Sequence, residues 1–480
     1  MARLKSENQQ TAETFRDIIP TADRTGKRIW VFSREPKGRY YTWRKLVAWA
    51  LLAIMFVGPF VSINGNPLLM FNLVERRFSI FGQMFWPSDI FIFAVCMIIF
   101  FVMIALFTAV FGRIWCGWMC PQTVLMEMVF RRIEYFIDGD SHAQKKLSAA
   151  PWTWKKIAKR ALKYGIFFLV SFIIGNWLLM YIIGWREVWT IISDNPLNHL
   201  RGLSAMLAFT GVFFLIFARF REQACTFVCP YGRFQSALVD SNSLIVSYDP
   251  KRGEQRGAFK RTQPLDVRRS MGLGDCTDCG LCVDVCPTGV DIRNGLQMEC
   301  VHCTACIDAC DSVMDRLKLP RGLIRYASQE GINTGKPFRF TPRMIGYCGV
   351  LILLTAFLGY LLLSRTDVQA TPLLRMPGQV YTQLPGDWIQ NVYLTKVRNK
   401  ARGPLPITLK VLEPEGGRVM LQGGREIPPG ELVQLAIPVQ LPAQALQNGH
   451  RDVVVGLYSG EQLIQRMKTG FTGPAESGAR

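Results

Sequence analysis

Eight of the 14 cysteines of this 480-residue chain lie between residues 276 and 310. The segment CTDCGLCVDVCP spaces four cysteines as C-x2-C-x2-C-x3-C, and CVHCTACIDAC repeats the spacing. Bacterial ferredoxins use this run to assemble two [4Fe–4S] clusters. The pattern therefore predicts an electron-transfer module.

In the ferredoxin pattern, three cysteines of each run wrap one cluster and the fourth binds the other cluster. We therefore expect two ligand sets: Cys276, Cys279, Cys282 and Cys310 for the first cluster, and Cys300, Cys303, Cys306 and Cys286 for the second. Zinc is the alternative. Structural zinc usually takes four ligands from two separated pairs, so the third cysteine of each run would have no role.

Two residues of this block depart from a plain ferredoxin pattern. Asp311 follows the last cysteine where the motif has proline, which bears on the local backbone shape only. His302 lies between two ligands. We expect it to be solvated rather than to act as a fifth ligand.

A second pair of cysteine motifs follows two apolar stretches. RIWCGWMCPQT holds Cys116 and Cys120, REQACTFVCPYG holds Cys225 and Cys229, and a proline follows each second cysteine. The proline predicts that a helix ends or kinks there. Thiolates select Cu(I), zinc or iron–sulfur centres. A disulfide would strain a helical turn, because helical Cβ atoms four residues apart are about 5–6 Å from each other, against about 3.5–4.5 Å in a disulfide.

We expect these four CxxxCP thiols to bind copper or to relay electrons. Their use as small packing residues is the alternative. The two remaining cysteines, Cys96 and Cys348, lie within apolar stretches, where a thiol usually packs as a small apolar side chain.

Five stretches approach the roughly 20 apolar residues that cross a bilayer. They are residues 45–63, 90–111, 164–184, 202–220 and 344–364. The first forty residues are polar and charged, so we expect no cleavable signal peptide and take the first stretch as an anchor. The net charge of +20 fits a membrane protein with basic cytoplasmic loops, and we expect no binding to nucleic acid.

The distribution of Lys and Arg predicts the orientation. Residues 1–45 carry 11 of them and 112–163 carry 10, whereas 64–89 and 185–201 carry two each. The positive-inside rule places the first two segments in the cytoplasm, where thiols stay reduced. Five spans then define these parts: a cytoplasmic segment 1–44, four spans within 45–220, a cytoplasmic domain 221–343, the fifth span 344–364, and an extracytoplasmic domain 365–480.

Spans one and two with the first CxxxCP motif, and spans three and four with the second, resemble two copies of one unit. Such internal symmetry often brings equivalent ends together around a shared site. We therefore expect the four CxxxCP thiols to converge at the cytoplasmic membrane surface, beside the ferredoxin-type domain. None of the four histidines lies within a span, so a transmembrane bis-histidine haem is not expected.

Three other segments have a readable pattern. Residues 130–147 are aromatic and basic, and we expect them to lie at the interface on anionic lipid. The outer loop 64–89 is aromatic and is expected to lie along the membrane surface. Residues 389–460 alternate apolar and polar side chains in short runs punctuated by Gly and Pro, which predicts a β-sandwich. The absence of cysteines there favours a docking role.

Together these segments resemble the CcoG (also FixG or RdxA/RdxB) accessory proteins of cytochrome cbb3 oxidase assembly. The residues that carry the resemblance are GRYYTWRKLVAWALLAIMFVGPF (38–60), NGNPLL (64–69), RIWCGWMCPQTVLMEMVFRRIE, ACTFVCPYGRFQ, the dicluster block and GLIRYAS (322–328). The resemblance implies an immunoglobulin-like C-terminal domain and a cupric reductase of the bacterial inner membrane. Electrons from the clusters would reduce Cu(II) to Cu(I) for the copper site of the oxidase, with assembly factors or copper chaperones as partners.

The expected fold is therefore an α-helical membrane protein with five transmembrane helices, an inserted α+β dicluster ferredoxin domain and a C-terminal all-β immunoglobulin-like sandwich. Two other functions stay open. One is a quinol dehydrogenase resembling NapH, which would pass electrons to an outer partner. The other is a scaffold without enzymatic activity. The electron donor is not evident from the sequence.

Overall fold

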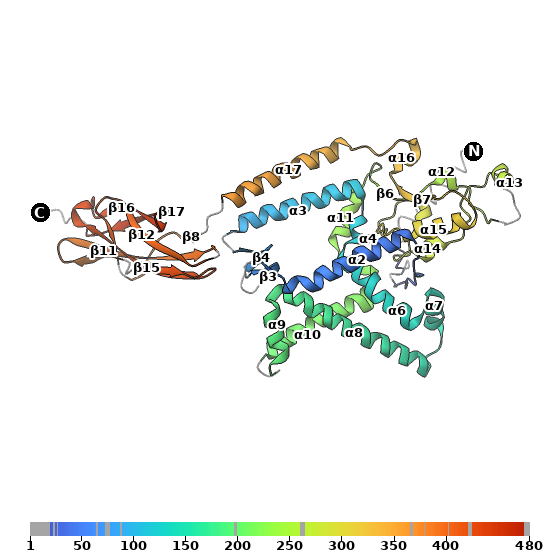
Figure 1. Cartoon of the computed structure of the whole chain (residues 1–480), viewed down its shortest axis with the longest axis horizontal. Helices are drawn as coiled ribbons and strands as arrows, with labels where there is room; N and C mark the ends of the chain where they lie inside the picture. The colour runs from blue at the N-terminus through green and yellow to red at the C-terminus, as the bar shows by residue number, and fades with distance from the viewer. Residues whose placement is uncertain are drawn as a thin grey trace. The chain divides into compact units, whose positions relative to one another are not determined.

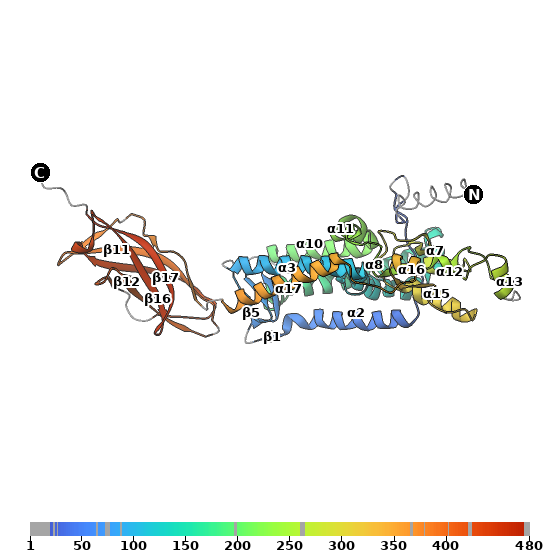
Figure 2. The same ribbon diagram turned by 90° about the horizontal axis from the view of Figure 1, so that it is seen from above.

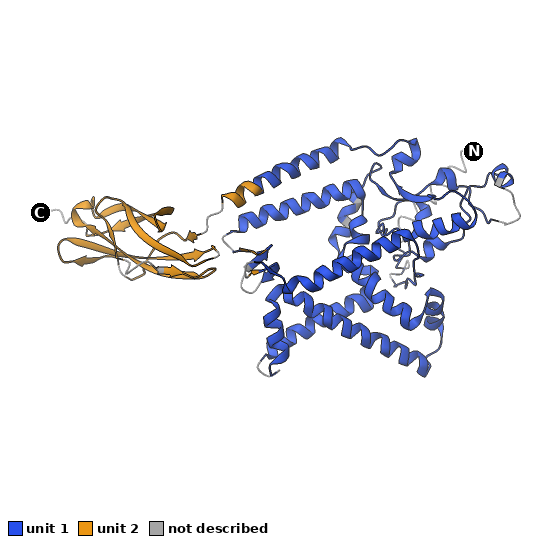
Figure 3. Cartoon of the chain, in the orientation of Figure 1, with its two compact units in different colours: residues 1–63, 67–81, 85–358 blue, residues 64–66, 82–84, 359–480 orange. Residues whose placement is uncertain are grey.

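The computed structural model of the protein describes residues 20–22, 25, 27–63, 66–72, 77–86, 89–195, 199–259, 265–364, 368–378, 380–401, 403–420 and 425–474. The chain forms two units (Figure 3): unit 1 comprises residues 1–63, 67–81 and 85–358, and unit 2 comprises 64–66, 82–84 and 359–480. Residues 1–19 of the predicted N-terminal segment and 475–480 of the predicted outer domain lie outside the described residues.

Within the described residues, five helices are long and apolar enough to cross a membrane. They are α2 (Arg39–Val57) with the 3-10 turn η1 (Gly58–Phe60), α3 (Ile90–Phe111), α8 (Trp154–Ile183), α10 (Leu200–Leu215) with the π-helical turn η4 (Ile216–Phe220), and α17 (Pro342–Leu363). These helices confirm the five predicted spans. The third helix begins ten residues before the predicted apolar stretch, because the basic residues that precede the stretch continue the same helix.

Aromatic contacts hold the spanning helices of unit 1 together. Helices α3 and α17 run side by side in both views (Figure 1, Figure 2), and the rings of Phe91 and Phe357 meet edge to face with centroids 6.3 Å apart. Helix α8 packs on α10 through Phe168 and Phe214, with centroids 5.9 Å apart. The Trp177 indole N–H donates to the carbonyl oxygen at the end of α2.

Short elements fill the connections between these spans. After α3 come α4 (Ile114–Trp118), α5 (Pro121–Leu125), the π-helical turn η3 (Met126–Phe130), α6 (Arg131–Asp138) and α7 (Ser141–Ala149); after α8 comes α9 (Trp185–Ser193); after α10 come the π-helical turn η5 (Ala224–Val228) and α11 (Pro230–Leu238). The prediction that residues 130–147 lie on anionic lipid is wrong for Arg131, which is buried inside the protein. Its carboxylate partners, described below, favour this burial.

The loop between the first two spans contains short strands: β1 (Ser62–Ile63), β2 (Asn66–Pro67), β3 (Leu69–Asn72), β4 (Arg77–Ile80) and β5 (Gln83–Phe85). Strands β3 and β4 pair antiparallel. That this loop lies along the membrane surface stays a prediction.

The cysteine-rich domain of unit 1 consists of short helices and a pair of strands. Its elements are β6 (Ile245–Tyr248), α12 (Pro250–Gly253), α13 (Leu265–Ser270), α14 (Leu281–Asp284), η6 (Ile292–Asn294), α15 (Ala305–Arg316), β7 (Ile324–Ala327) and α16 (Gln329–Thr334). Strands β6 and β7 pair antiparallel. The Asp308 carboxylate accepts the backbone N–H groups of Tyr40 (3.1 Å) and Tyr41 (2.7 Å), which caps the start of α2. The first span is thus tied to this domain.

Unit 2 contains the β-sandwich that the sequence predicts. One sheet has the order β10-β11-β15-β13, with β8 and β9 also on β11, and the other has the order β14-β12-β16-β17. The strands are β8 (Val368–Ala370), β9 (Leu374–Arg375), β10 (Thr382–Leu384), β11 (Trp388–Asn399), β12 (Leu405–Glu413), β13 (Arg418–Val419), β14 (Arg425–Ile427), β15 (Leu432–Pro442), β16 (His450–Ser459) and β17 (Gln462–Thr472), with the 3-10 turn η7 (Ala443–Ala445) after β15. Inward-facing residues alternate along the strands, as in β11, and bury one core between the sheets.

Candidate electron-transfer site

The ferredoxin-type cysteines gather around α14 and α15. Burial and, after it, the neighbouring thiols of Cys282 and Cys276 raise the pKa of the Cys310 thiol to about 12. Burial likewise raises the pKa of Cys300 to about 12, and the thiol of Cys286 is the next cause. The fourth cysteine of each run therefore lies beside the other run, as crossed ligand sets require.

These residues fit an iron–sulfur cluster. A cavity is lined by five of them: Cys282, Cys286, Cys300, Cys303 and Cys306. The Val290 N–H donates to the Cys286 sulfur at 3.3 Å. Among the described residues, no group of three or more His, Cys, Asp or Glu is arranged to hold a single metal ion. Cationic iron would offset the cost of ionising buried thiols.

The two CxxxCP motifs share one backbone design. In each motif, the residue four positions before the first cysteine has a positive φ: 57° at Gly112 and 53° at Arg221. Cys120 and Cys229 are extended, with φ −61° and −74°, and each is followed by a proline that begins α5 or α11. The prediction that the helix ends before the proline is confirmed, and the internal symmetry extends to the backbone.

The two motifs converge in unit 1. Burial raises the pKa of the Cys225 thiol to about 12, and the other three CxxxCP thiols are the next causes. A Cβ added at Gly232 of α11 would lie 2.4 Å from the Cys225 carbonyl oxygen and 3.1 Å from the Arg113 guanidinium. Arg113 belongs to the first motif and thus lies against the second. All four thiols are free.

The first motif also packs directly on a ligand loop of the cysteine-rich domain. A Cβ added at Gly117 would lie 2.4 Å from the Val301 carbonyl oxygen and 2.9 Å from the Cα atom of Cys303. The buried Arg44 of α2 donates from Nε to the Gly117 carbonyl oxygen at 2.7 Å. Only glycine at this position allows such a close approach of two backbones.

A chain of hydrogen bonds joins the same two regions. The Gln235 amide lies 3.4 Å from the Cys116 sulfur through Nε2, and its Oε1 accepts from Arg113 Nε. The Arg113 backbone N–H donates to His302 Nδ1 at 2.9 Å. Gln235 is fully buried. One arginine therefore links a CxxxCP thiol to the loop between Cys300 and Cys303.

The prediction that His302 is solvated is wrong. The imidazole is 1% exposed, and burial, with the charge of Arg113, lowers its pKa to about 3. Because Gly112 lacks a side chain, the ring can approach its backbone: a Cβ there would lie 2.8 Å from His302 Cε1. The neutral ring thus packs against the backbone of Gly112 and Arg113, at the start of the first CxxxCP motif.

Arg44, Arg113 and Gln235 were not evident as site residues from the sequence. One signal was present. Arg113 and Glu222 each stand three residues before the first cysteine of a CxxxCP motif. A charged residue is therefore part of the repeated pattern in both copies, with opposite sign.

A buried ion-pair network surrounds this site on the side of α6. Arg131 contacts Glu127 at 2.6 Å and Glu222 at 3.9 Å, and it also donates to the Pro287 carbonyl oxygen at 3.3 Å. Pro287 directly follows a cysteine of the cluster block. Arg28, from the N-terminal segment, contacts Glu222 at 2.8 Å. The network connects the membrane helices to the cluster loop.

We expect Arg131→Met to destabilise unit 1 by about 3–5 kcal/mol, because it removes the ion-pair partner of the buried Glu127 carboxylate. Lys145→Met removes an exposed cation of α7 and is the matched control. Thermal unfolding of the purified protein in detergent measures the effect. A melting temperature equal to that of the control variant would contradict the structural role of Arg131.

Three sequence families match the chain. Residues 220–329 match a 4Fe-4S dicluster domain, 93–143 match a 4Fe-4S binding domain, and 358–474 match the family described as an IG-like fold at the C-terminus of FixG. The first match covers the cysteine-rich domain and the second covers the first CxxxCP motif. The third agrees with the β-sandwich of unit 2.

Curated relatives align with most of the chain. Protein RdxA of Cereibacter sphaeroides is 33% identical over 425 residues, which are 83% of this chain and 86% of RdxA. Protein RdxB of the same organism is 33% identical over 398 residues, 79% and 81% of the two chains. The nitrogen fixation protein FixG of Rhizobium meliloti is 34% identical over 63% of this chain and 58% of FixG. A FixG-related protein from Vibrio parahaemolyticus, solved by crystallography, aligns with 22% of this chain and 97% of its own at 18% identity, with a TM-score of 0.20.

Proposed function

Because the chain belongs to the RdxA, RdxB and FixG family of iron–sulfur membrane proteins of electron transport, we propose that it reduces Cu(II) to Cu(I). The Cu(I) would supply the copper site of cytochrome cbb3 oxidase during assembly. Copper is the substrate in this proposal. Oxidase assembly factors or copper chaperones are the proposed partners.

We assign two [4Fe–4S] clusters to the cysteine-rich domain. Cys276, Cys279, Cys282 and Cys310 would hold the first, and Cys300, Cys303, Cys306 and Cys286 the second. Each bound cluster supplies one-electron redox chemistry. Four of these thiols, those of Cys276, Cys282, Cys300 and Cys303, are buried. Their burial and the N–H donor of Val290 support this assignment.

Cys116, Cys120, Cys225 and Cys229 are the proposed copper or thiol-relay residues. Thiolates favour the softer Cu(I) over Cu(II), so their binding would favour the reduced product. Two thiolates are enough for a Cu(I) ion with low coordination number.

One observation carries the proposal. The backbone of Gly117, next to Cys116, lies against the loop of Val301 and Cys303. Electron transfer between the two cysteine sites therefore needs no moving domain. The Arg113 bridge from Gln235 to His302 supports the same route.

The location of the protein follows from the charge pattern. We propose the bacterial inner membrane, with the N-terminal segment and the cysteine-rich domain in the cytoplasm and the β-sandwich outside. The basic segments 1–45 and 112–163 support this orientation.

We expect Gly117→Ala to slow Cu(II) reduction by up to about a hundredfold, because displacing a reacting group by about 1 Å can have that effect. The added methyl group would meet the Val301 carbonyl oxygen and force the two backbones apart. Gly165→Ala in α8 is the control, because nothing lies within 4 Å of its Cβ position. Initial rates of Cu(I) formation measure the effect, and equal rates in both variants would contradict the contact's role.

The proposed function is tested on anaerobically purified protein whose clusters have been verified by EPR. Dithionite-reduced protein should convert added Cu(II) to Cu(I), followed with a Cu(I)-specific chelator. Reduction of an outer protein partner by quinol, without copper reduction, would favour the quinol dehydrogenase. Normal oxidase assembly by a variant without clusters would favour the scaffold.

A further inference from the structure

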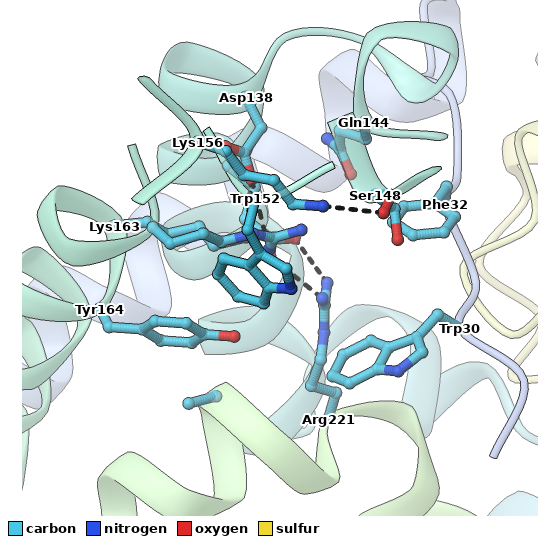
Figure 4. A pocket seen from close by; sticks show the side chains of 13 residues that line it. Trp30, Phe32, Asp138, Gln144, Ser148, Trp152, Lys156, Lys163, Tyr164 and Arg221 are labelled. Atoms are coloured by element: carbon cyan, nitrogen blue, oxygen red, sulfur yellow. Dashed lines mark hydrogen bonds and ion pairs between the residues drawn. The ribbon is translucent and has the colours of Figure 1, made fainter. Parts of the chain in front are cut away.

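A separate cavity of about 270 Å³ lies between α6, α7, the first turns of α8 and the end of η4. Figure 4 shows its side chains. Trp30 and Phe32 of the N-terminal segment, Trp152 and Tyr164 contribute aromatic surface. The rest of the wall is mostly charged and polar, with side chains from α6, α7 and α8 and with Arg221 directly after η4. The mechanism proposed above does not use this cavity.

Two buried carboxylates line the cavity, and their pairing is uneven. Glu134 is fully engaged: Arg221 donates to both of its oxygens, at 3.0 and 2.6 Å. Asp138 accepts from Lys163 through Oδ2 at 2.6 Å. Its Oδ1 is buried and has no hydrogen-bond partner in the described structure. Arg160 lies 4.0 Å from Asp138, beyond hydrogen-bond distance. The cavity therefore offers one free buried acceptor and a nearby donor.

The cavity lies at the edge of the membrane-spanning part of α8. Its wall includes Lys156, Arg160 and Lys163, and the uninterrupted apolar stretch of this helix begins just after them. Exposed tryptophans beside the cavity, such as Trp152, are typical of the membrane interface. A ligand dissolved in the bilayer could enter here with an apolar tail in the lipid.

The same wall touches the electron-transfer site. Arg221 lines this cavity and also a second cavity, which contains Cys225, Pro287 and Thr288. Pro287 directly follows Cys286. Arg221 thus belongs to the walls of both the membrane-edge cavity and the cavity beside Cys225 and Pro287.

We propose that this cavity binds the headgroup of a membrane quinol, the electron donor of the protein. The proposal rests on the electron-transfer function proposed above. One ring hydroxyl would donate to the Asp138 carboxylate, and the ring would lie among the aromatic side chains. Quinol would lose two electrons, one to each oxidised cluster, and both O–H bonds would break to leave quinone. One proton would pass to Asp138 and the other to water, and Asp138 would then release its proton to water.

A phosphate-bearing lipid headgroup is the competing ligand, because Lys and Arg line the cavity. Such an anion would have to lie beside Asp138 and Glu134, whose oxygens cannot donate a hydrogen bond when ionised. A neutral quinol hydroxyl matches the free acceptor instead. The side chains of the cavity wall therefore favour the binding of a quinol over that of a phosphate-bearing lipid.

Binding is tested with the full-length protein in detergent, by calorimetric titration of a short-tailed ubiquinone. This measurement needs neither copper nor electron transfer, so its result is independent of cupric reductase activity. Trp152→Ala should weaken binding about five- to tenfold, as expected for the loss of an aromatic contact. Trp154→Ala removes an equally exposed tryptophan that does not line the cavity, and it should leave binding unchanged.

The proposed role of Asp138 as the proton acceptor is tested with a separate variant. Asp138→Asn should retain quinone binding within about threefold but slow the bleaching of cluster absorbance by a short-tailed ubiquinol about a hundredfold, as for loss of a general base. Equal quinone affinities of the Trp152→Ala and Trp154→Ala variants would overturn the proposal. A second result would also overturn it: the protein binds no quinone, and native mass spectrometry shows that bound phosphatidylglycerol is lost from the Arg160→Gln variant but kept by the Lys159→Gln variant.

Discussion

Replacement of Cys116 or Cys225 by serine is expected to slow Cu(II) reduction more than about a hundredfold, while the iron content and the EPR signals of the clusters stay as in the unmodified protein. Loss of a residue that only hydrogen-bonds to a metal ligand lowers activity or metal affinity about 10–100-fold. Here a proposed ligand itself is removed, so the effect should be larger. The thiols lie outside the crossed ligand sets, so the clusters should assemble normally. Cu(I) formation and iron content are measured on the same samples.

The matched control is Cys96→Ser, which removes a free thiol of α3 outside both cysteine sites. Its Cu(II) reduction should equal that of the unmodified protein. Full activity in the Cys116→Ser and Cys225→Ser variants would mean that the CxxxCP thiols serve in packing only. Loss of iron in these variants would instead make them cluster ligands, which the match of residues 93–143 to a 4Fe-4S binding domain makes a necessary check.

The second large effect concerns the crossed ligand sets. Cys286→Ser should remove the cluster that we assign to Cys300, Cys303 and Cys306, and with it about half of the iron. Cu(II) reduction should fall by up to about a hundredfold, because the Cys300–Cys303 loop that would hold this cluster lies beside the first CxxxCP motif. Iron analysis and EPR of the reduced protein give the number of clusters that remain.

Double variants distinguish crossed from uncrossed ligation. Adding Cys303→Ser to Cys286→Ser should cost no further iron, because both residues serve the same cluster. Adding Cys282→Ser should remove the first cluster as well. If Cys282→Ser added to Cys286→Ser cost no further iron, and Cys303→Ser did, then Cys282 and Cys286 would serve the same cluster. That result would contradict the crossed assignment.

Much of the fold could be predicted because its causes are local. Five long apolar stretches form spans wherever they occur in a membrane protein, and the helix ends at the CxxxCP prolines follow from proline's missing N–H. The alternating pattern of residues 389–460 likewise fixes inward and outward faces of β11 and its neighbours. The start of α8 was missed because its basic residues are helical but not apolar.

The environment of the site could not be predicted in the same way. The burial of His302 depends on Gly112, 190 residues earlier in the chain, whose missing side chain makes room for the ring. The role of Gln235 depends on the approach of α11 to the first motif. Such contacts join distant segments, and the spacing of residues within one segment does not encode them.

The most direct test of the central claim is a single-turnover experiment. Protein with fully reduced clusters is mixed anaerobically with Cu(II), and cluster absorbance and Cu(I) formation are followed together. We predict that one Cu(I) appears for each cluster that is reoxidised, with the same time course, and that neither change occurs at a comparable rate in the Cys116→Ser/Cys225→Ser variant. Cluster reoxidation by Cu(II) at the same rate in that variant would contradict the account.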